Sequence, residues 1–147
     1  MTETDTRVNI IDPKLYQSGW SNNLITREYY FTDGRKLIGG KRGKRYFVDY
    51  LLVYKNTNLA IIEAKAQNKD PLDGLQQSIN YAQKLKIDFV YSTNGTQIYE
   101  HSLFSGKGRF IEDYPTPEEL FYRKFGKLKE QEERVITQNF YFEGNKK

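Results

Sequence analysis

Two β-prone segments separated by only four residues constrain the fold of this chain more than any other feature. Residues 46–54 (YFVDYLLVY) and 59–65 (LAIIEAK) are rich in β-branched and aromatic residues, which favours strands. The polar connection, residues 55–58 (KNTN), reads as a turn, so the two strands pair as an antiparallel hairpin. The chain therefore contains a sheet, and this hairpin is its most strongly predicted part.

Other segments alternate between helical and strand patterns. Apolar residues three to four apart predict helices over residues 3–18, with a break at Pro13, and over residues 75–85. Further strands are predicted over residues 26–31, 88–92 and 96–100, with a tight turn at 93–95 between the last two. This order predicts an α/β (α+β) fold with a mixed central β-sheet flanked by helices.

The C-terminal part of the sequence predicts a last helix and then a tail. Thr116 is placed to cap a helix that starts at Pro117, with Glu119 as the capping-box acid. We expect residues 1–124 to form one domain, and residues 125–147 to be a charged linker with a helix over 127–134.

Three charged residues stand in the apolar hairpin: Asp49 in the first strand, and Glu63 and Lys65 at the end of the second. A buried carboxylate is costly unless it is paired or binds a metal, and a divalent cation relieves the repulsion between two carboxylates. Asp49 faces Glu63 only if the turn has an odd length or a bulge; otherwise Asp49 lies opposite Ala64. The alternative to a metal site is an edge-strand aspartate and a surface Glu–Lys pair.

A metal site in this position assigns a role to each group. Asp49, Glu63 and the carbonyl of Ala64 would bind Mg²⁺, which lowers the pKa of a bound water. Lys65 would position or help to deprotonate that water, or hold a phosphate. On the following helix, Gln77 and Tyr81 are one turn apart and share a face, so they could reach Lys65 or a DNA phosphate, although packing also accounts for Tyr81.

A basic cluster precedes the first hairpin strand. Lys41, Arg42, Lys44 and Arg45 fall within five residues of a chain whose net charge is +4. Such a cluster attracts phosphate, so these four residues are candidate DNA contacts; the alternative is a solvated basic loop.

Composition excludes several classes of site. The chain has no cysteine and one histidine, His101, so thiol catalysis, disulfides and multi-histidine metal centres are excluded. No apolar run is long enough for a membrane span, and the acidic start of the chain is not a secretory signal. We expect a cytoplasmic protein with no membrane contact.

Asp49, Glu63-Ala64-Lys65 and the Gln77/Tyr81 pair resemble the D, ExK and QxxxY motifs of the PD-(D/E)xK nuclease superfamily, in its RecB-like branch. Further stretches resemble the N-terminal nuclease domain of type I restriction enzyme R (HsdR) subunits, and they are residues 4–7 (TDTR), 11–13 (IDP), 19–20 (GW), 93–95 (TNG) and 114–120 (YPTPEEL). The resemblance covers residues 2–122 in the order of the family.

The resemblance implies a restriction-endonuclease-like core and an Mg²⁺-dependent endodeoxyribonuclease that cuts double-stranded DNA. It also implies methylase and specificity subunits as partners, and ATP use only through a translocase domain that this chain lacks, since it has no GxxxxGK[ST] motif. The family often has an acidic metal ligand on its first helix, for which Glu3 is our first candidate and Glu28 the second. The proline of the family's name is replaced by Val48.

Other functions are compatible with the same residues. A catalytically idle DNA-binding or assembly module could share the fold, and a free-standing repair-type nuclease could share the site. An RNA-binding domain is less favoured, because the sequence has no RNP or KH signature.

Overall fold

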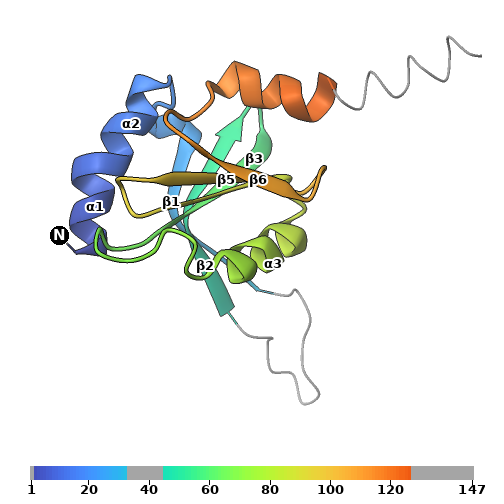
Figure 1. Ribbon diagram of the computed structural model, residues 1–147. Coiled ribbons are helices and arrows are strands. Elements are labelled where there is room, and N and C mark those ends of the chain that lie inside the picture. Colours follow the sequence, from blue (N-terminus) through green and yellow to red (C-terminus); the bar gives the residue numbers. More distant parts are fainter. Residues whose placement is uncertain (1, 33–44, 127–147) are drawn as a thin grey trace, which may run out of the picture.

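The predicted hairpin is the centre of a six-stranded sheet in the computed structural model, which describes residues 2–32 and 45–126 (Figure 1). The strands lie in chain order across the sheet, and only β3 and β4 are parallel. Their bounds are β1 (Ile25–Thr32), β2 (Arg45–Tyr54), β3 (Thr57–Ala64), β4 (Phe89–Thr93), β5 (Ile98–Ser102) and β6 (Lys107–Ile111). The sheet is therefore mixed, as the sequence predicts.

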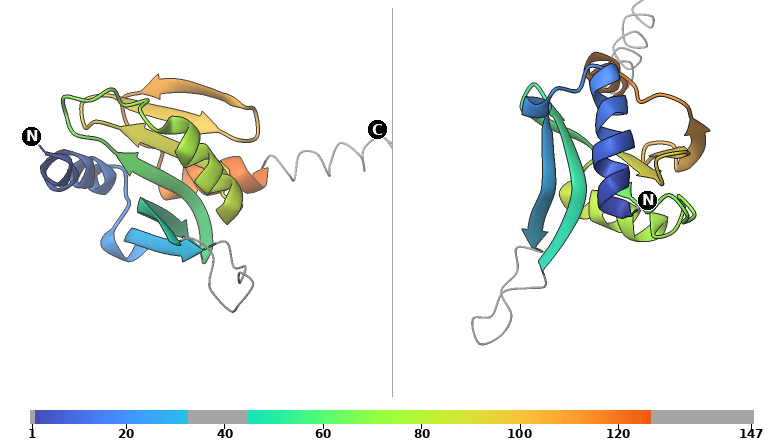
Figure 2. Two further views of the ribbon diagram at one scale, coloured as in Figure 1. Left: turned by 90° about the horizontal axis from the view of Figure 1, so that it is seen from below. Right: turned by 90° about the vertical axis from the view of Figure 1, so that its left-hand side faces the viewer.

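Helix α3 (Leu75–Leu85) makes the crossover that the parallel pair β3–β4 requires. It lies on one face of the sheet, whereas the C-terminal helix lies on the other (Figure 2). The buried residues of the α3 face include Val48, Leu51 and Ile61, which pack with Ala82 of α3. This packing fixes the start of α3 beside the end of β3.

The opposite face is covered by the N-terminal helical segment and by helical residues 117–126. Fully buried Trp20 anchors this layer, and its Nε1 donates a 2.9 Å hydrogen bond to the carbonyl of Pro115. Leu15 and Leu120 pack in the same core cluster. Segments about a hundred residues apart in the chain thus close one core.

The N-terminal segment is helical throughout, so the predicted break at Pro13 is wrong. Helix α1 (Glu3–Thr6) begins at the capping box of Thr2, a π-helical turn follows over Arg7–Ile11, and α2 (Asp12–Gln17) contains Pro13 in its first turn. The wider π turn, in which the N–H of Asp12 bonds to the carbonyl of Arg7, accommodates a proline that cannot donate its own bond. A π turn of this kind is frequent at functional sites.

Two further elements were not predicted: the 3₁₀ turn η2 (Asn22–Leu24) and strand β6. Thr116 caps the start of the C-terminal helix as predicted, because its Oγ1 accepts a 3.1 Å hydrogen bond from the N–H of Glu119; the return bond from the N–H of Thr116 to the Glu119 carboxylate is not among the hydrogen bonds of the described residues. The carboxylate of Glu119 pairs with Arg123 at 2.8 Å.

Some predictions fall outside the described residues: most of the loop between β1 and β2, including Lys41, Arg42 and Lys44, and the linker helix over 127–134. Among the described helices, none combines the length and apolar character needed to cross a membrane.

Candidate nuclease site

The last pair of the β2–β3 ladder is Tyr50 with Ile62, and the same register continued by one residue puts Asp49 opposite Glu63. Lys55 and Asn56 form a two-residue turn with left-handed φ values of 51° and 58°, typical of a type I′ hairpin. That turn alone would put Asp49 opposite Ile62, and Glu63 would then lie on the other face of its strand. A bulge corrects it: Val53 pairs with Asn58 but Leu52 pairs with Ala60, so Leu59 has no partner. The bulge that the metal hypothesis required is therefore present.

Both ladders beside Asp49 are interrupted at its position. On one side, the β2–β3 pairing stops at Tyr50 and Ile62. On the other, Glu28 of β1 stands opposite Asp49 without pairing and has a φ of 51°, which is rare for a non-glycine residue. Val48 and Leu51 pack in one core cluster and Tyr50 in the other, so the facing of β2 reverses here. Asp49, which is only 3% exposed, therefore lies in β2 at a point where the pairing with both β1 and β3 is interrupted.

Asp49 is held by one backbone donor and one cation. Its Oδ2 accepts a 2.8 Å hydrogen bond from the N–H of Ala64. Its Oδ1 lies 3.5 Å from Nη1 of Arg7, which is also 3.6 Å from Oε2 of Glu28. Burial raises the pKa of Asp49, whereas the Ala64 bond, Arg7 and Lys65 oppose the rise. The π turn of the first helix thus brings a positive charge into contact with the aspartate.

Glu63 is the unsatisfied group of the site. Its Oε1 is buried and has no hydrogen-bond partner among the described residues. Burial, and then the charge of Asp49, raise the pKa of Glu63 to about 8. A buried oxygen without a donor, beside a second carboxylate, is a place where a cation is stabilising.

Glu3 is within electrostatic reach of the same centre. Its pKa is raised by burial and then by Asp49, while Arg7 and Lys65 lower it. In the described ranges, however, no three acidic, histidine or cysteine side chains stand together in metal-binding geometry. The carboxylate pair and the Ala64 carbonyl are therefore the oxygen groups that could serve a metal, and Glu3 remains a candidate for a further ligand.

Lys65 extends to the start of α3. A Cβ atom added to Gly74, the N-cap of α3, would lie only 3.1 Å from Nζ of Lys65. Gly74 also has a φ of 81°, so the absence of a side chain serves both the backbone and the lysine. The ammonium group is positioned by the end of β3 and by this glycine.

Gln77 and Tyr81 bond to each other rather than to the carboxylates. Nε2 of Gln77 donates to the hydroxyl of Tyr81, whose ring packs edge-on against Phe31 at 5.5 Å and beside Tyr46 at 5.3 Å. In the described chain, neither residue is hydrogen-bonded to Lys65. Packing is therefore an established role of Tyr81, while Gln77 is exposed on the surface of α3.

Arg45 is the one member of the basic cluster within the described residues. It begins β2, is exposed, and its guanidinium lies 4.3 Å from the centre of the Tyr30 ring.

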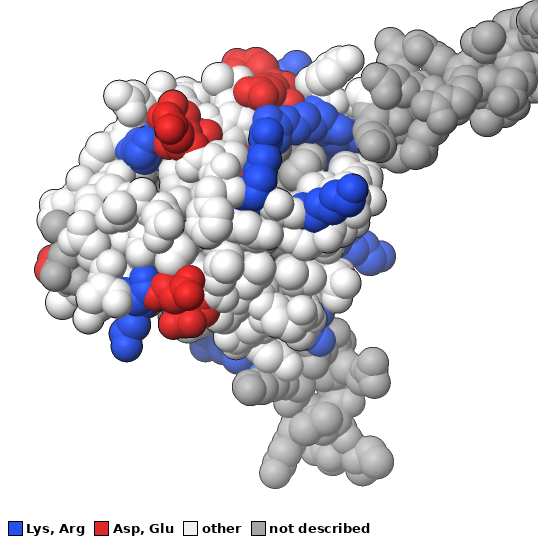
Figure 3. Space-filling model, in the orientation of Figure 1, with Lys and Arg blue, Asp and Glu red and all other residues white. Residues whose placement is uncertain are grey.

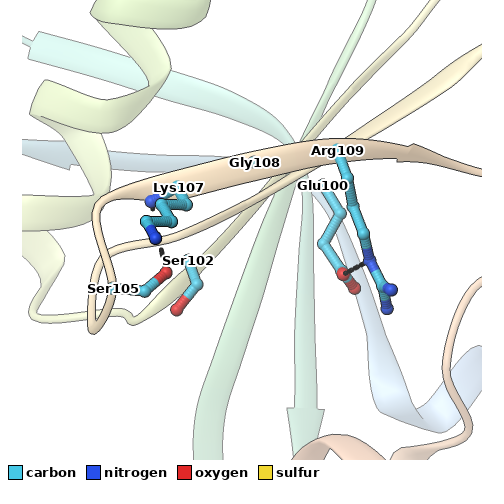
Figure 4. A pocket seen from close by; sticks show the side chains of 6 residues that line it. All are labelled: Glu100, Ser102, Ser105, Lys107, Gly108 and Arg109. Carbon is cyan, nitrogen blue, oxygen red and sulfur yellow. Dashed lines mark hydrogen bonds and ion pairs between the residues drawn. The ribbon is translucent and has the colours of Figure 1, made fainter.

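A separate polar cluster lies around Glu100 of β5, and here the carboxylate oxygens have partners, unlike Oε1 of Glu63. The carboxylate of Glu100 accepts from Tyr91 at 2.7 Å and pairs with Arg109 at 3.3 Å and Arg123 at 3.0 Å. Figure 4 shows the shallow pocket on its β6 side, where Lys107 and Ser105 also lie. Because Glu100 is fully paired, we assign it a structural role.

On the face drawn in Figure 3, Lys and Arg side chains gather near the C-terminal helix.

Sequence reasoning missed two residues of the site. Arg7 carries a signal in retrospect, since it is a cation one turn after Glu3 in the first helix. Gly74 directly precedes the predicted helix, but the approach of Lys65 depends on the tertiary structure.

Comparison with known proteins identifies relatives of one kind, although no protein-family model matches the chain. The EcoAI endonuclease subunit of a type I restriction enzyme from Escherichia coli is 34% identical over 161 aligned positions, which cover 100% of this chain and 20% of that protein. A fragment structure assigned to an HsdR subunit of a type I restriction enzyme from Vibrio vulnificus superposes with a TM-score of 0.75 at 42% identity, over 86% of this chain and 26% of that one. The chain thus spans only about a fifth to a quarter of the length of these relatives. From its full-length sequence match and its shared fold, the chain is homologous to the HsdR subunits of type I restriction enzymes.

Proposed function

We propose that this chain is the Mg²⁺-dependent nuclease part of a type I restriction R subunit and hydrolyses phosphodiester bonds of double-stranded DNA. The observation that carries the proposal is the Asp49–Glu63 pair, in which one buried oxygen of Glu63 has no donor in the described structure. The name of the Escherichia coli relative, an endonuclease subunit, supports the same activity.

The groups present fit a magnesium ion. Mg²⁺ prefers oxygen ligands and binds through one or two carboxylates plus substrate oxygens and water. The N–H of Ala64 points to Asp49, and in an extended strand the carbonyl of the same residue faces the same edge. Asp49, Glu63 and the Ala64 carbonyl would therefore hold the ion, with Glu3 as a candidate fourth group. When bound, Mg²⁺ would supply charge for the phosphate and a water of lowered pKa.

The remaining residues have electrostatic and positioning roles. Lys65 directly follows β3, two residues after Glu63. It would hold the scissile phosphate or orient the attacking water, because its ammonium is fixed beside Gly74. Arg7 lies 3.5 Å from the carboxylate of Asp49 and opposes the rise in its pKa that burial causes. Gln77, Tyr81 and the basic cluster with Arg45 would contact the DNA backbone, which gives sequence-independent and salt-dependent binding.

The partners follow from the relatives rather than from the site. We expect the DNA target to be chosen by specificity and methylase subunits, and ATP to act through a translocase domain elsewhere in the R subunit. The boundary of the nuclease domain after residue 124 remains part of this proposal.

A plasmid-cleavage assay in the complete R subunit, assembled in its restriction complex, tests the activity. The wild type should cut in Mg²⁺ and not in EDTA. Asp49→Asn, Glu63→Gln and Lys65→Ala should each lose most of the cleavage while retaining ATP hydrolysis. Asp113→Asn is the matched control, because Asp113 pairs with Lys14 at the surface. Undiminished cutting by the three site variants would show that the site is assigned wrongly.

A catalytically idle module is the second candidate, and one observation favours it. Arg7 already places a positive charge beside Asp49, as a salt bridge would in a former metal site that no longer binds a cation. Under this alternative, replacement of Asp49 leaves the cleavage by the complex, whether present or absent, unchanged.

A further inference from the structure

The outer half of the β1–β2 pair has one covered face and one open face. On the covered face, Phe31 and Tyr46 stack at 5.4 Å and pack with Tyr81 of α3. On the open face, Tyr30 and Phe47 are cross-strand partners whose ring centres lie 5.5 Å apart. Their exposed fractions are 49% and 47%, so the two rings present apolar surface to solvent. The packed face gives the open face a rigid support.

A cation completes this open face. The guanidinium of Arg45 lies 4.3 Å from the centre of the Tyr30 ring, so the ring holds it in place. None of the ion pairs formed within the described ranges includes Arg45. Two half-exposed rings beside one exposed guanidinium match the aromatic and positive surfaces that bind nucleic acid.

The aromatic face adjoins the candidate site. Tyr30 is two residues from Glu28, and Phe47 is two residues from Asp49, which corresponds to about 7 Å along a strand. The outer half of the β1–β2 pair extends toward the lower end of the molecule in Figure 1. A duplex with a phosphate at Asp49 and Glu63 would therefore reach Tyr30 and Phe47 within a few nucleotides.

Charge favours DNA over a protein as the partner. The twelve residues that join β1 to β2 in sequence, 33–44, contain Arg35, Lys36, Lys41, Arg42 and Lys44 against the single acid Asp33. The sequence next to Arg45 therefore carries a net charge of +4, and DNA is the polyanion that the proposed reaction supplies.

We propose that Tyr30, Phe47 and Arg45 form a binding surface for the DNA duplex that flanks the cut. The inference rests on the proposed nuclease function. A two-stranded ribbon fits a DNA groove, in which the rings would pack against sugars and base edges while Arg45 contacts a phosphate. The surface has no means of reading sequence beyond shape, so it would position the strand rather than select a target.

Fluorescence anisotropy with a labelled 20-base-pair duplex, in EDTA and at low salt, tests this surface without requiring cleavage. The full chain is compared with Tyr30→Ala/Phe47→Ala and with Arg45→Gln. Tyr122→Ala is the matched control, because Tyr122 is 67% exposed on the C-terminal helix at the other end of the molecule. Thermal unfolding of each variant confirms that it is folded, which half-exposed positions should allow.

The double variant should bind the duplex about tenfold more weakly, since it removes the apolar surface that two half-exposed rings would bury against sugars and base edges. Arg45→Gln should bind more weakly and lower the salt dependence by about one phosphate contact. Tyr122→Ala should bind as the wild type does. Unchanged binding by the double variant, no duplex binding by the wild type, or binding of single strands alone would each overturn the proposal. Binding and cutting separate the two proposals. Asp49→Asn should bind the duplex as the wild type does. If it does so and the wild type never cuts, the nuclease function fails while the binding surface stands.

Discussion

Oδ2 of Asp49 accepts a 2.8 Å hydrogen bond from the backbone N–H of Ala64. This side-chain bond takes over where the β2–β3 ladder ends, at the pair Tyr50–Ile62. It ties the aspartate to the strand that carries Glu63 and Lys65, so the spacing of the three charged groups is set by the sheet and not by a loop. Sites built on strands hold their geometry more closely than sites on loops.

Replacement of Arg7 should destabilise the metal-free protein more than loss of a surface ion pair. Arg7→Gln removes the cation beside Asp49, which is 3% exposed, and we expect a loss of about 1–2 kcal/mol in urea unfolding. Lys14→Gln, which breaks the exposed pair with Asp113, should cost no more than about 1 kcal/mol. Equal losses in the two variants would mean that Arg7 is an ordinary surface residue.

Gly74 should matter to cleavage through Lys65. Gly74→Ala forces a methyl group to 3.1 Å from Nζ of Lys65 and also strains a backbone with φ of 81°. Gly106→Ala has the same kind of strain, with φ of 70°, but its added Cβ meets nothing within 4 Å. Both variants should lose about 1 kcal/mol of stability, whereas only Gly74→Ala should lose plasmid cleavage by the complex. Equal cleavage by the two variants would remove Lys65 from the mechanism as we describe it.

Glu63 should give the metal-free protein a distinctive pH dependence. In the native state its pKa is about 8, raised from 4.5, so between these values the native state binds more protons than the unfolded state. The contribution of Glu63 to the free energy of unfolding is therefore greatest below pH 4.5 and is lost as the pH rises toward about 8.

The measurement is urea unfolding in EDTA across this pH range. Wild type should lose stability on going to higher pH relative to Glu63→Gln, which cannot ionise. Added Mg²⁺ should reduce the loss in the wild type, because the ion binds the deprotonated carboxylate. Parallel profiles for the two proteins would mean that Glu63 is not desolvated.

The strands and α3 were predictable because their signals are local. Residues 46–54 and 75–85 carry the β and helical patterns in their own sequence, and Thr116 carries its cap. Strand β6 lacks such a signal, since four of its five residues are exposed and it is an edge strand. Its pairing with β5 comes from the hairpin geometry rather than from an apolar period.

The site could be predicted as residues but only in part as geometry. The sequence left the register of Asp49 open between Glu63 and Ala64, and the observed register depends on the bulge at Leu59, which shifts the pairing by one residue. The reversal of β2 at Asp49 and the left-handed backbone of Glu28 have no local signature. The contact of Arg7 with Asp49 arises from the π turn, which is a response of the continuous helix to Pro13.

The central claim is that Asp49 and Glu63 share one divalent cation. An anomalous difference map from a crystal of this chain soaked in Mn²⁺ tests it most directly, because Mn²⁺ takes the oxygen ligands of Mg²⁺ and scatters anomalously. We predict one strong peak within about 2.0–2.6 Å of the carboxylates of Asp49 and Glu63 and the carbonyl of Ala64, absent in Glu63→Gln. A map with no peak there, while Mn²⁺ binds elsewhere or not at all and Arg7 stays on Asp49, would contradict the account.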